Sequence, residues 1–152
     1  MTTLRDDSVC DSILIRVRFL EPRSRRHWGT MTAHGAICHL TDWFRASLGE
    51  KPVTPATGIL QQTVVKWFAL HSPLPWPHGI PSRPELAQGE GGTSPEEFEA
   101  DRSALIRSIY DFRKAEEYLS KAKHPIFGRM TYLEWQRWGY LHLDHHLRQF
   151  GA

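Results

Sequence analysis

Histidines near the C-terminus are the residues of this chain best suited to chemistry. Nine of the 152 residues are His, and three of them lie close together, at positions 142, 145 and 146. On a helix, His142 and His146 share one face, with their Cβ atoms about 5–6 Å apart. Two imidazoles at this spacing can bind one metal ion, as they do in the helical HExxH motif. Leu143 replaces the Glu of that motif, which excludes a metalloprotease of that kind.

A metal site with two His ligands needs a further ligand from another helix. His39 is the best candidate, because it lies among apolar residues in mid-helix, where an unpaired imidazole would be costly to bury. His34 is nearer the start of the same helix and is expected to be exposed. His145 remains an alternative to His146, since His142 and His145 also share a helix face. The other interpretation is structural, with the His pair on a solvated face and His39 hydrogen-bonded in the core.

Helices joined by Pro- and Gly-rich turns are predicted to position these histidines. Apolar residues recur at helical spacing, and no run alternates as a half-buried strand would. Pro and Gly are densest between residues 72 and 93, where a long crossover is predicted. Long helices are predicted over residues 8–21, 32–48, 94–121 and 131–149, with a short extra helix over 58–71. This pattern predicts an all-α fold, a four-helix bundle forming one domain over residues 1–152.

Start and stop signals support the ends of these helices. Ser8, Ser94 and Thr131 each precede an acidic residue three positions on, as in a capping box, and are expected as N-caps. Pro95 fits the first helical position after Ser94. Gly49 fits the end of the second helix, where a residue in the left-handed conformation is favoured.

Charge and hydropathy exclude two classes of partner. The formal net charge is +2, and no Lys/Arg block is long enough to bind nucleic acid. The densest basic run, residues 23–26, is expected to be a solvated turn. The longest apolar stretch, residues 59–70, is interrupted by Gln61, Gln62 and Lys66, and is too short and polar to span a bilayer. We therefore expect neither a nucleic-acid partner nor a membrane.

The cysteines and the N-terminal segment indicate a cytoplasmic protein. Cys10 and Cys38 are too few for a disulfide framework, and each is expected to be a small buried residue within a helix. Cys38 adjoins His39, but neighbouring helical residues point about 100° apart, so no Cys–His nucleophile is predicted. Residues 1–7 are polar, unlike a signal peptide.

The last helix resembles the C-terminal signature of the DinB/YfiT-like superfamily. That signature is a His-x-x-x-His followed by a near-terminal Gln, and it is matched by His142, His146 and Gln149. The resemblance covers nearly the whole chain, and the last helix is its strongest motif. Shorter runs also resemble the DinB-like subgroup, namely residues 28–31, 37–40, 75–77, 91–93, 124–128 and 131–135.

The resemblance implies which histidines bind the metal. In that superfamily one ligand comes from the second helix and two from the His-x-x-x-His, which corresponds here to His39, His142 and His146. It therefore favours His146 over His145. Arg148 is a departure, because many members have Gly there.

Three neutral imidazoles would leave at least one metal position open for water or substrate. Such a site suits Zn, Ni or Fe(II), and a bound divalent metal would activate a water or a thiol. Characterised relatives in the superfamily include thiol-S-transferases and thiol-dependent isomerases. The resemblance thus implies a metal-dependent enzyme, either a thiol-S-transferase or a hydrolase-like protein, with a small-molecule or thiol substrate. It also implies a homodimer. The alternatives are a non-catalytic bundle that binds a metal or small ligand in a stress-related role, and a purely structural dimer.

Residues around the ligands are expected to tune the site. A His ligand usually donates its second N–H to an outer acceptor, for which Asp42 and Gln149 are candidates. The crossover is expected to shape the pocket mouth, with Trp76 or Arg83 reaching into it.

Overall fold

The computed structural model describes residues 1–152 and is mostly helical, which confirms the predicted helical class. A two-stranded antiparallel sheet, which the sequence did not predict, joins α5 to α6. The α-helices are α1 (Asp7–Phe19), α2 (Ala33–Ser47), α3 (Lys66–His71), α4 (Phe98–Lys114), α5 (Glu116–Lys121) and α6 (Tyr132–Gln149). The remaining elements are the π-helix η1 (Gln61–Val65), the 3-10 helix η2 (Pro84–Leu86) and the strands β1 (Lys123–His124) and β2 (Gly128–Arg129).

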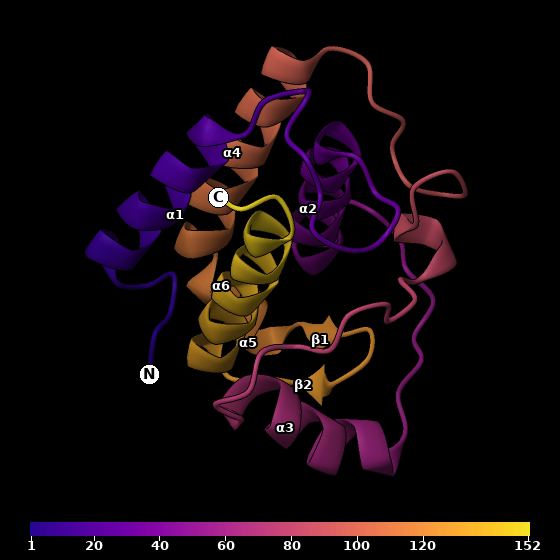
Figure 1. The fold of residues 1–152 in the computed structure, drawn as a ribbon. Helices are drawn as coiled ribbons and strands as arrows, with labels where there is room; N and C mark the ends of the chain where they lie inside the picture. The colour runs from indigo at the N-terminus through magenta and orange to yellow at the C-terminus, as the bar shows by residue number, and fades with distance from the viewer.

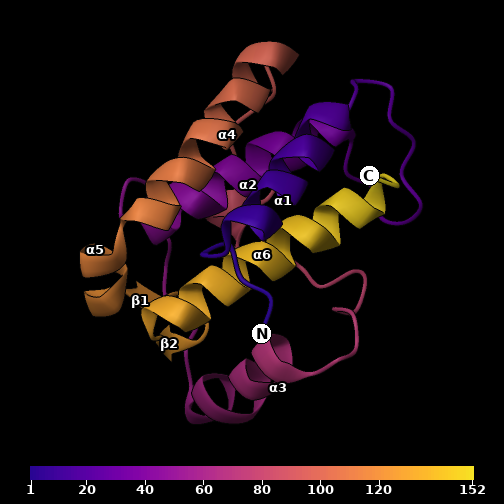
Figure 2. The same cartoon turned by 90° about the vertical axis from the view of Figure 1, so that its left-hand side faces the viewer.

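The long helices pack around a shared core. Helix α2 packs against α4 and α6, and α1 packs against the same two helices (Figure 1). Helix α3 lies to one side, below α6, with the crossover running past it (Figure 2). The apolar stripe of α1 is buried at the helical spacing that the sequence predicts, through Cys10, Ile13, Leu14 and Val17. Burial of each large apolar side chain contributes about 1.5–3 kcal/mol.

Two of the predicted helix starts agree with the structure. Thr131 and Glu134 form the capping box that begins α6. Thr32 caps α2 by accepting a hydrogen bond from Gly35 N at 3.0 Å. At the end of α2, Gly49 has a φ of +77°, as its predicted role requires.

The predicted start of α1 at Ser8 is slightly late. The N-cap is Asp6, whose carboxylate accepts from Ser8 N at 3.1 Å. The prediction took the later of two residues that are both good caps.

The predicted helix over residues 94–121 is wrong at its start and in its middle. The N-cap of α4 is Glu97 rather than Ser94, because the Asp101 carboxylate accepts from Glu96 N at 3.1 Å and holds this segment in a non-helical form. The helix breaks at Ala115, which separates α4 from α5. The Tyr132 hydroxyl donates to the Arg113 carbonyl beside this break, which occupies an acceptor of the helix.

The crossover is tied to α2 at its far end. The Asp42 carboxylate accepts from the backbone N–H and the hydroxyl of Thr93, each at 2.7 Å, and from Lys51 Nζ at 3.1 Å. Within the crossover, η2 inserts Leu86 into the core, where its side chain is fully buried. These contacts fix the Leu86 carbonyl beside α2.

None of the helices is both long and apolar enough to cross a membrane.

Candidate metal centre

Three histidines from two helices converge on one point. His39 comes from α2, and His142 and His146 come from successive turns of α6. Their candidate ligand atoms all lie within 4.8 Å of one another. The ring centroids are 5.4 Å apart for His39 and His142, 4.9 Å for His39 and His146, and 5.1 Å for His142 and His146. The structure therefore brings the three predicted residues close enough together to hold one cation.

Two of the three rings are oriented by hydrogen bonds through Nδ1. His39 Nδ1 donates to the Leu86 carbonyl at 2.9 Å. His146 Nδ1 donates to Gln149 Oε1 at 3.1 Å, and Gln149 Nε2 donates in turn to the Trp28 carbonyl at 2.9 Å. The Leu86 carbonyl is an acceptor only, so it fixes the proton of His39 on Nδ1. The Trp28 carbonyl orients the Gln149 amide so that its oxygen faces His146, which fixes the proton of His146 on Nδ1 in the same way. Both imidazoles keep a free lone pair on Nε2. This tautomer is the one a metal ligand needs.

The third ring contains a buried nitrogen without a partner. His142 is 6% exposed, and its Nδ1 makes no hydrogen bond. A buried polar atom without a partner destabilises the fold by about 1–3 kcal/mol. An unsatisfied atom inside a cluster of ligands is what a site built for a further group would contain.

Burial keeps the three imidazoles neutral. It lowers the pKa of His39, and together with the neighbouring His146 it lowers the pKa of His142 well below the usual value. Burial, followed by the effect of His39, lowers the pKa of His146 to about 3. At neutral pH the site therefore offers lone pairs rather than positive charge, and a cation does not have to displace protons.

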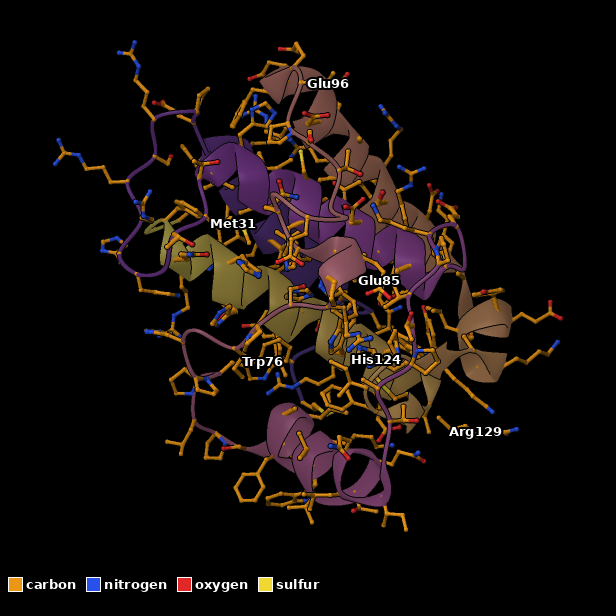
Figure 3. All side chains as sticks on the ribbon, turned by 90° about the vertical axis from the view of Figure 1, so that its right-hand side faces the viewer. Met31, Trp76, Glu85, Glu96, His124 and Arg129 are labelled. Carbon is orange, nitrogen blue, oxygen red and sulfur yellow. The ribbon has the colours of Figure 1, made fainter.

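The triad lies in the wall of a pocket of about 840 Å³. Helix α3 and the crossover form the opposite wall, and Met31, Trp76 and His124 mark the region in Figure 3. Six large aromatic side chains line it, namely Trp28, Trp43, Phe68, Trp76, Phe127 and Trp138. The lining contains no Asp, Glu, Lys or Arg. The pocket is thus apolar except for its histidines and a few neutral polar groups.

His124 is a functional candidate that the sequence interpretation did not assign. Its Nδ1 accepts from the backbone N–H groups of Ile126 and Phe127 at 3.1 and 3.2 Å, so its proton lies on Nε2. The ring lies between Trp43 and Phe127, nearly parallel to both. Burial lowers the pKa of His124 to about 3, and its Nε2 has no hydrogen-bond partner. The sequence signal for this residue is the run of residues 124–128, which resembles the DinB-like subgroup.

Other predicted site residues have mixed outcomes. Gln149 contacts a ligand ring as predicted, but Asp42 contacts Thr93 and Lys51 rather than His39. Trp76 lines the pocket, and its Nε1 donates to the Ala69 carbonyl at 2.8 Å. The expectation for Asp42 was wrong, because its carboxylate accepts hydrogen bonds from Thr93 and Lys51.

Three further residues that the sequence analysis considered for the site lie outside the triad. Arg83, the other residue expected to reach in, lies outside the pocket lining. His145 lines the pocket but is not one of the three converging residues. His34, expected to be exposed, is only partly so, because its Nε2 lies 2.7 Å from the Asp101 carboxylate.

Comparison with known proteins gives one family. The family described as "Protein of unknown function (DUF1569)" matches residues 11–152. The chain belongs to the DUF1569 family. The match includes all three converging histidines of this DUF1569 protein, and it ends at the last residue of the chain. No curated protein and no solved structure gives a match.

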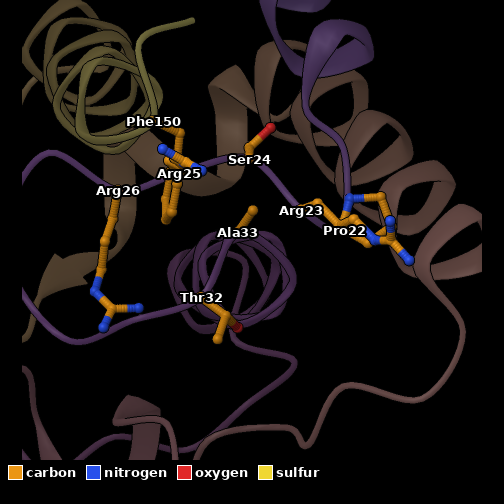
Figure 4. Close-up of a pocket in the computed structure, with 8 residues that line it drawn as sticks. All are labelled: Pro22, Arg23, Ser24, Arg25, Arg26, Thr32, Ala33 and Phe150. Atoms are coloured by element: carbon orange, nitrogen blue, oxygen red, sulfur yellow. The ribbon is translucent and has the colours of Figure 1, made fainter.

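A second, smaller pocket of the DUF1569 chain is basic but does not form a site. It is lined by the turn over residues 22–26, with Thr32 and Ala33 at the start of α2. Figure 4 shows the side chains of Arg23 and Arg26 pointing in different directions rather than toward one another. The arginines are exposed, as the sequence predicted for a solvated turn. The histidine pocket is therefore the candidate functional site.

Proposed function

We propose that this DUF1569 chain is a divalent-metal-dependent enzyme whose metal is held by His39, His142 and His146. The observation that carries the proposal is the convergence of three neutral, buried imidazoles in the wall of an open aromatic pocket. Zn, Ni or Fe(II) suits such a ligand set. When bound, a divalent cation lowers the pKa of a coordinated water or thiol and so supplies a nucleophile at neutral pH.

The charge of the pocket favours a thiol or another anionic ligand. No carboxylate lines the pocket, so the residues themselves provide no negative charge to balance a divalent cation. Anions such as a thiolate are attracted where a cation lies in apolar surroundings. This is the reason to propose a thiol-S-transferase, with a hydrolase-like reaction through water as the nearest variant. The aromatic walls suit a partly apolar second substrate.

Proton transfer in this pocket would fall to a histidine. His145 lines the pocket beside His146, with ring centroids 5.2 Å apart, and it also faces His78. Burial and His78 lower the pKa of His145, so its imidazole is neutral and can accept a proton. We assign His145 the role of proton acceptor in the proposed reaction.

The packing of α1, α2, α4 and α6 supports a DinB/YfiT-like four-helix bundle as the fold of this enzyme. Each of these helices packs against two of the others, and the histidines project inward from two that face each other. A homodimer is part of the same proposal, and light scattering at several protein concentrations tests it.

A non-catalytic role in binding a metal or small ligand is the second candidate. This role needs no proton transfer, and the apolar lining of the pocket suits a partly apolar ligand. The test is to measure metal per chain after purification without added metal, and then to screen low-molecular-weight thiols against several electrophiles. We expect one metal per triad and thiol-dependent turnover that is lost in His146→Ala. Stoichiometric metal without turnover for any thiol would favour the binding role, and metal content unchanged in His39→Ala and His146→Ala would contradict both.

A further inference from the structure

A second group of metal-ligating side chains lies between α2 and α4, on a different face of α2 from His39. It consists of His34, Cys38 and Asp101, whose candidate ligand atoms lie within 4.8 Å of one another. Asp101 Oδ2 is at the centre, 2.7 Å from His34 Nε2 and 3.6 Å from Cys38 Sγ. The backbone N–H of Glu96, just before the start of α4, also donates to Asp101. Figure 3 labels Glu96, which lies far from His124, so this group is remote from the histidine pocket.

Two helices hold this group in place. His34 and Cys38 are four residues apart on α2, so they lie one turn above the other on one face. Asp101 is in the first turn of α4, and α2 and α4 pack against each other along their length. The three side chains therefore meet because of the main helix–helix contact of the fold, not through a mobile loop.

The arrangement does not suit a cysteine nucleophile. A reactive thiol needs a histidine that accepts its proton. Here Cys38 donates to the Asp101 carboxylate, and His34 contacts that same oxygen rather than the sulfur. Cys38 is 3% exposed, and burial together with Asp101 raises the pKa of its thiol to about 12. A thiol in this state is inert toward electrophiles.

We propose that His34, Cys38 and Asp101 form a second cation site, specific for zinc or a similar divalent metal that accepts thiolate sulfur. Nitrogen, sulfur and carboxylate oxygen are the ligands that zinc takes in proteins. Sulfur disfavours Mg²⁺ and Ca²⁺, which prefer oxygen ligands. The metal displaces two protons, the thiol proton of Cys38 and the Nε2 proton that His34 donates to Asp101. The thiol proton is released to solvent, and His34 keeps a single proton by taking it on Nδ1 in place of Nε2. The site is separate from the proposed enzyme and does not depend on it.

The group can accept a cation after a small movement. The distance of 2.7 Å between His34 Nε2 and Asp101 Oδ2 is that of a hydrogen bond, whereas two ligands in a tetrahedral zinc site are about 3.3 Å apart, given metal–ligand bonds of about 2.0 Å. Both side chains are about one-fifth exposed, so they can rotate, and water can reach a fourth position. Asp101 Oδ1 makes no hydrogen bond and is available as a ligand.

Occupation of this site would link α2 to α4. Because α2 also carries His39, the link would fix the helix that presents one ligand of the triad. None of the three side chains lines the histidine pocket, so the expected role of a metal here is to brace the two helices.

Titration of the metal-free full chain with cobalt(II) tests the proposal. A thiolate bound to cobalt gives an intense sulfur-to-metal charge-transfer band in the near ultraviolet, which imidazoles alone do not give. We expect two cobalt ions per chain and one such band in the wild type. Cys38→Ala should bind one cobalt and lack the band, and His142→Ala should bind one and retain it.

Cys10→Ala is the matched control, because Cys10 is the other buried free cysteine and lies on α1, outside both groups. It should retain two ions and the full band. A wild-type chain without the band at saturating cobalt would overturn the proposal without recourse to any variant. A band that persists in Cys38→Ala would also overturn it, and if that variant fails to fold, Asp101→Asn should weaken the band at limiting cobalt. Loss of binding at the triad alone would contradict the proposed enzyme and leave this site standing.

Discussion

Individual residues beside the triad determine how well its rings are oriented. Gln149 is fixed on both sides, since its amide donates to the Trp28 carbonyl while its oxygen accepts from His146. A flipped amide would place a donor against a donor. Gln149 therefore selects the tautomer of His146 that leaves Nε2 free. Leu86 does the same for His39 through its backbone carbonyl.

Replacing Gln149 by Ala should weaken metal binding at the triad by about 10–100-fold, because outer partners of metal-bound histidines have effects of this size. Competition with a chromophoric chelator measures the affinity. Arg148→Ala is the control, since Arg148 is an exposed neighbour whose side chain pairs with Asp144. Equal affinities in wild type and Gln149→Ala would show that His146 is not a metal ligand oriented in this way.

The buried histidines should also make stability depend on pH. Unfolded histidines titrate near pH 6.5, whereas the folded pKa values of His124 and His146 are lowered to about 3. Below pH 6.5 the unfolded chain takes up protons that the folded chain cannot. The stabilisation is thus complete above about pH 6.5 and is lost progressively as the pH falls toward 3, by about 1.4 kcal/mol per pH unit for each such residue.

Urea unfolding of the metal-free chain between pH 7 and pH 4 measures this slope. His124→Gln should make it shallower by about 1.4 kcal/mol per pH unit, and replacement of the exposed His71 by Gln should leave it unchanged. A stability independent of pH in this range would mean that these rings are not buried as neutral groups.

At the scale of elements, helix starts decide where the functional side chains lie. The capping box of Thr131 and Glu134 sets the start of α6, and with it the phase at which His142 and His146 face α2. Ser94 and Glu97 make an equally good pattern in the sequence, yet α4 begins only after Glu97. The difference is tertiary, because Asp101 binds Glu96 N and also lies beside His34.

Thr131→Ala should therefore destabilise the fold by about 1 kcal/mol, which is typical of a lost N-cap. Ser94→Ala should change the free energy of unfolding by less than about 0.5 kcal/mol, as for an exposed surface residue. Urea unfolding of the two variants at neutral pH compares them directly. A larger effect at Ser94 than at Thr131 would contradict the observed helix starts.

At the scale of the whole molecule, the proposed metal binding is expected to be coupled to folding. The triad joins α2 to α6, so its ligands are brought together only in the folded chain. A ligand that binds only the folded state stabilises it, by about 2.7 kcal/mol at a free concentration one hundred times its Kd. For a chain of this size that corresponds to a rise in Tm of roughly 5–10 °C.

Calorimetry of the chain with zinc and after chelation measures the coupling. The rise should be at least halved in His142→Ala, where only the site at Cys38 remains to bind metal. A wild-type Tm that does not change on chelation would argue against a well-formed triad.

The sequence by itself determined the helical class, the α6 capping box and the i, i+4 pair on α6, because each depends on residues close together in the chain. It could not choose between His145 and His146 by spacing, nor bring His39 to them, since both depend on how α2 packs against α6. The role of the Leu86 carbonyl could not be predicted from the sequence, because every residue has a backbone carbonyl. His34, Cys38 and Asp101 likewise became a group only through the contact of α2 with α4. Tertiary packing alone decided which histidine rings are buried, which are oriented by hydrogen bonds and which ring nitrogens remain without a partner.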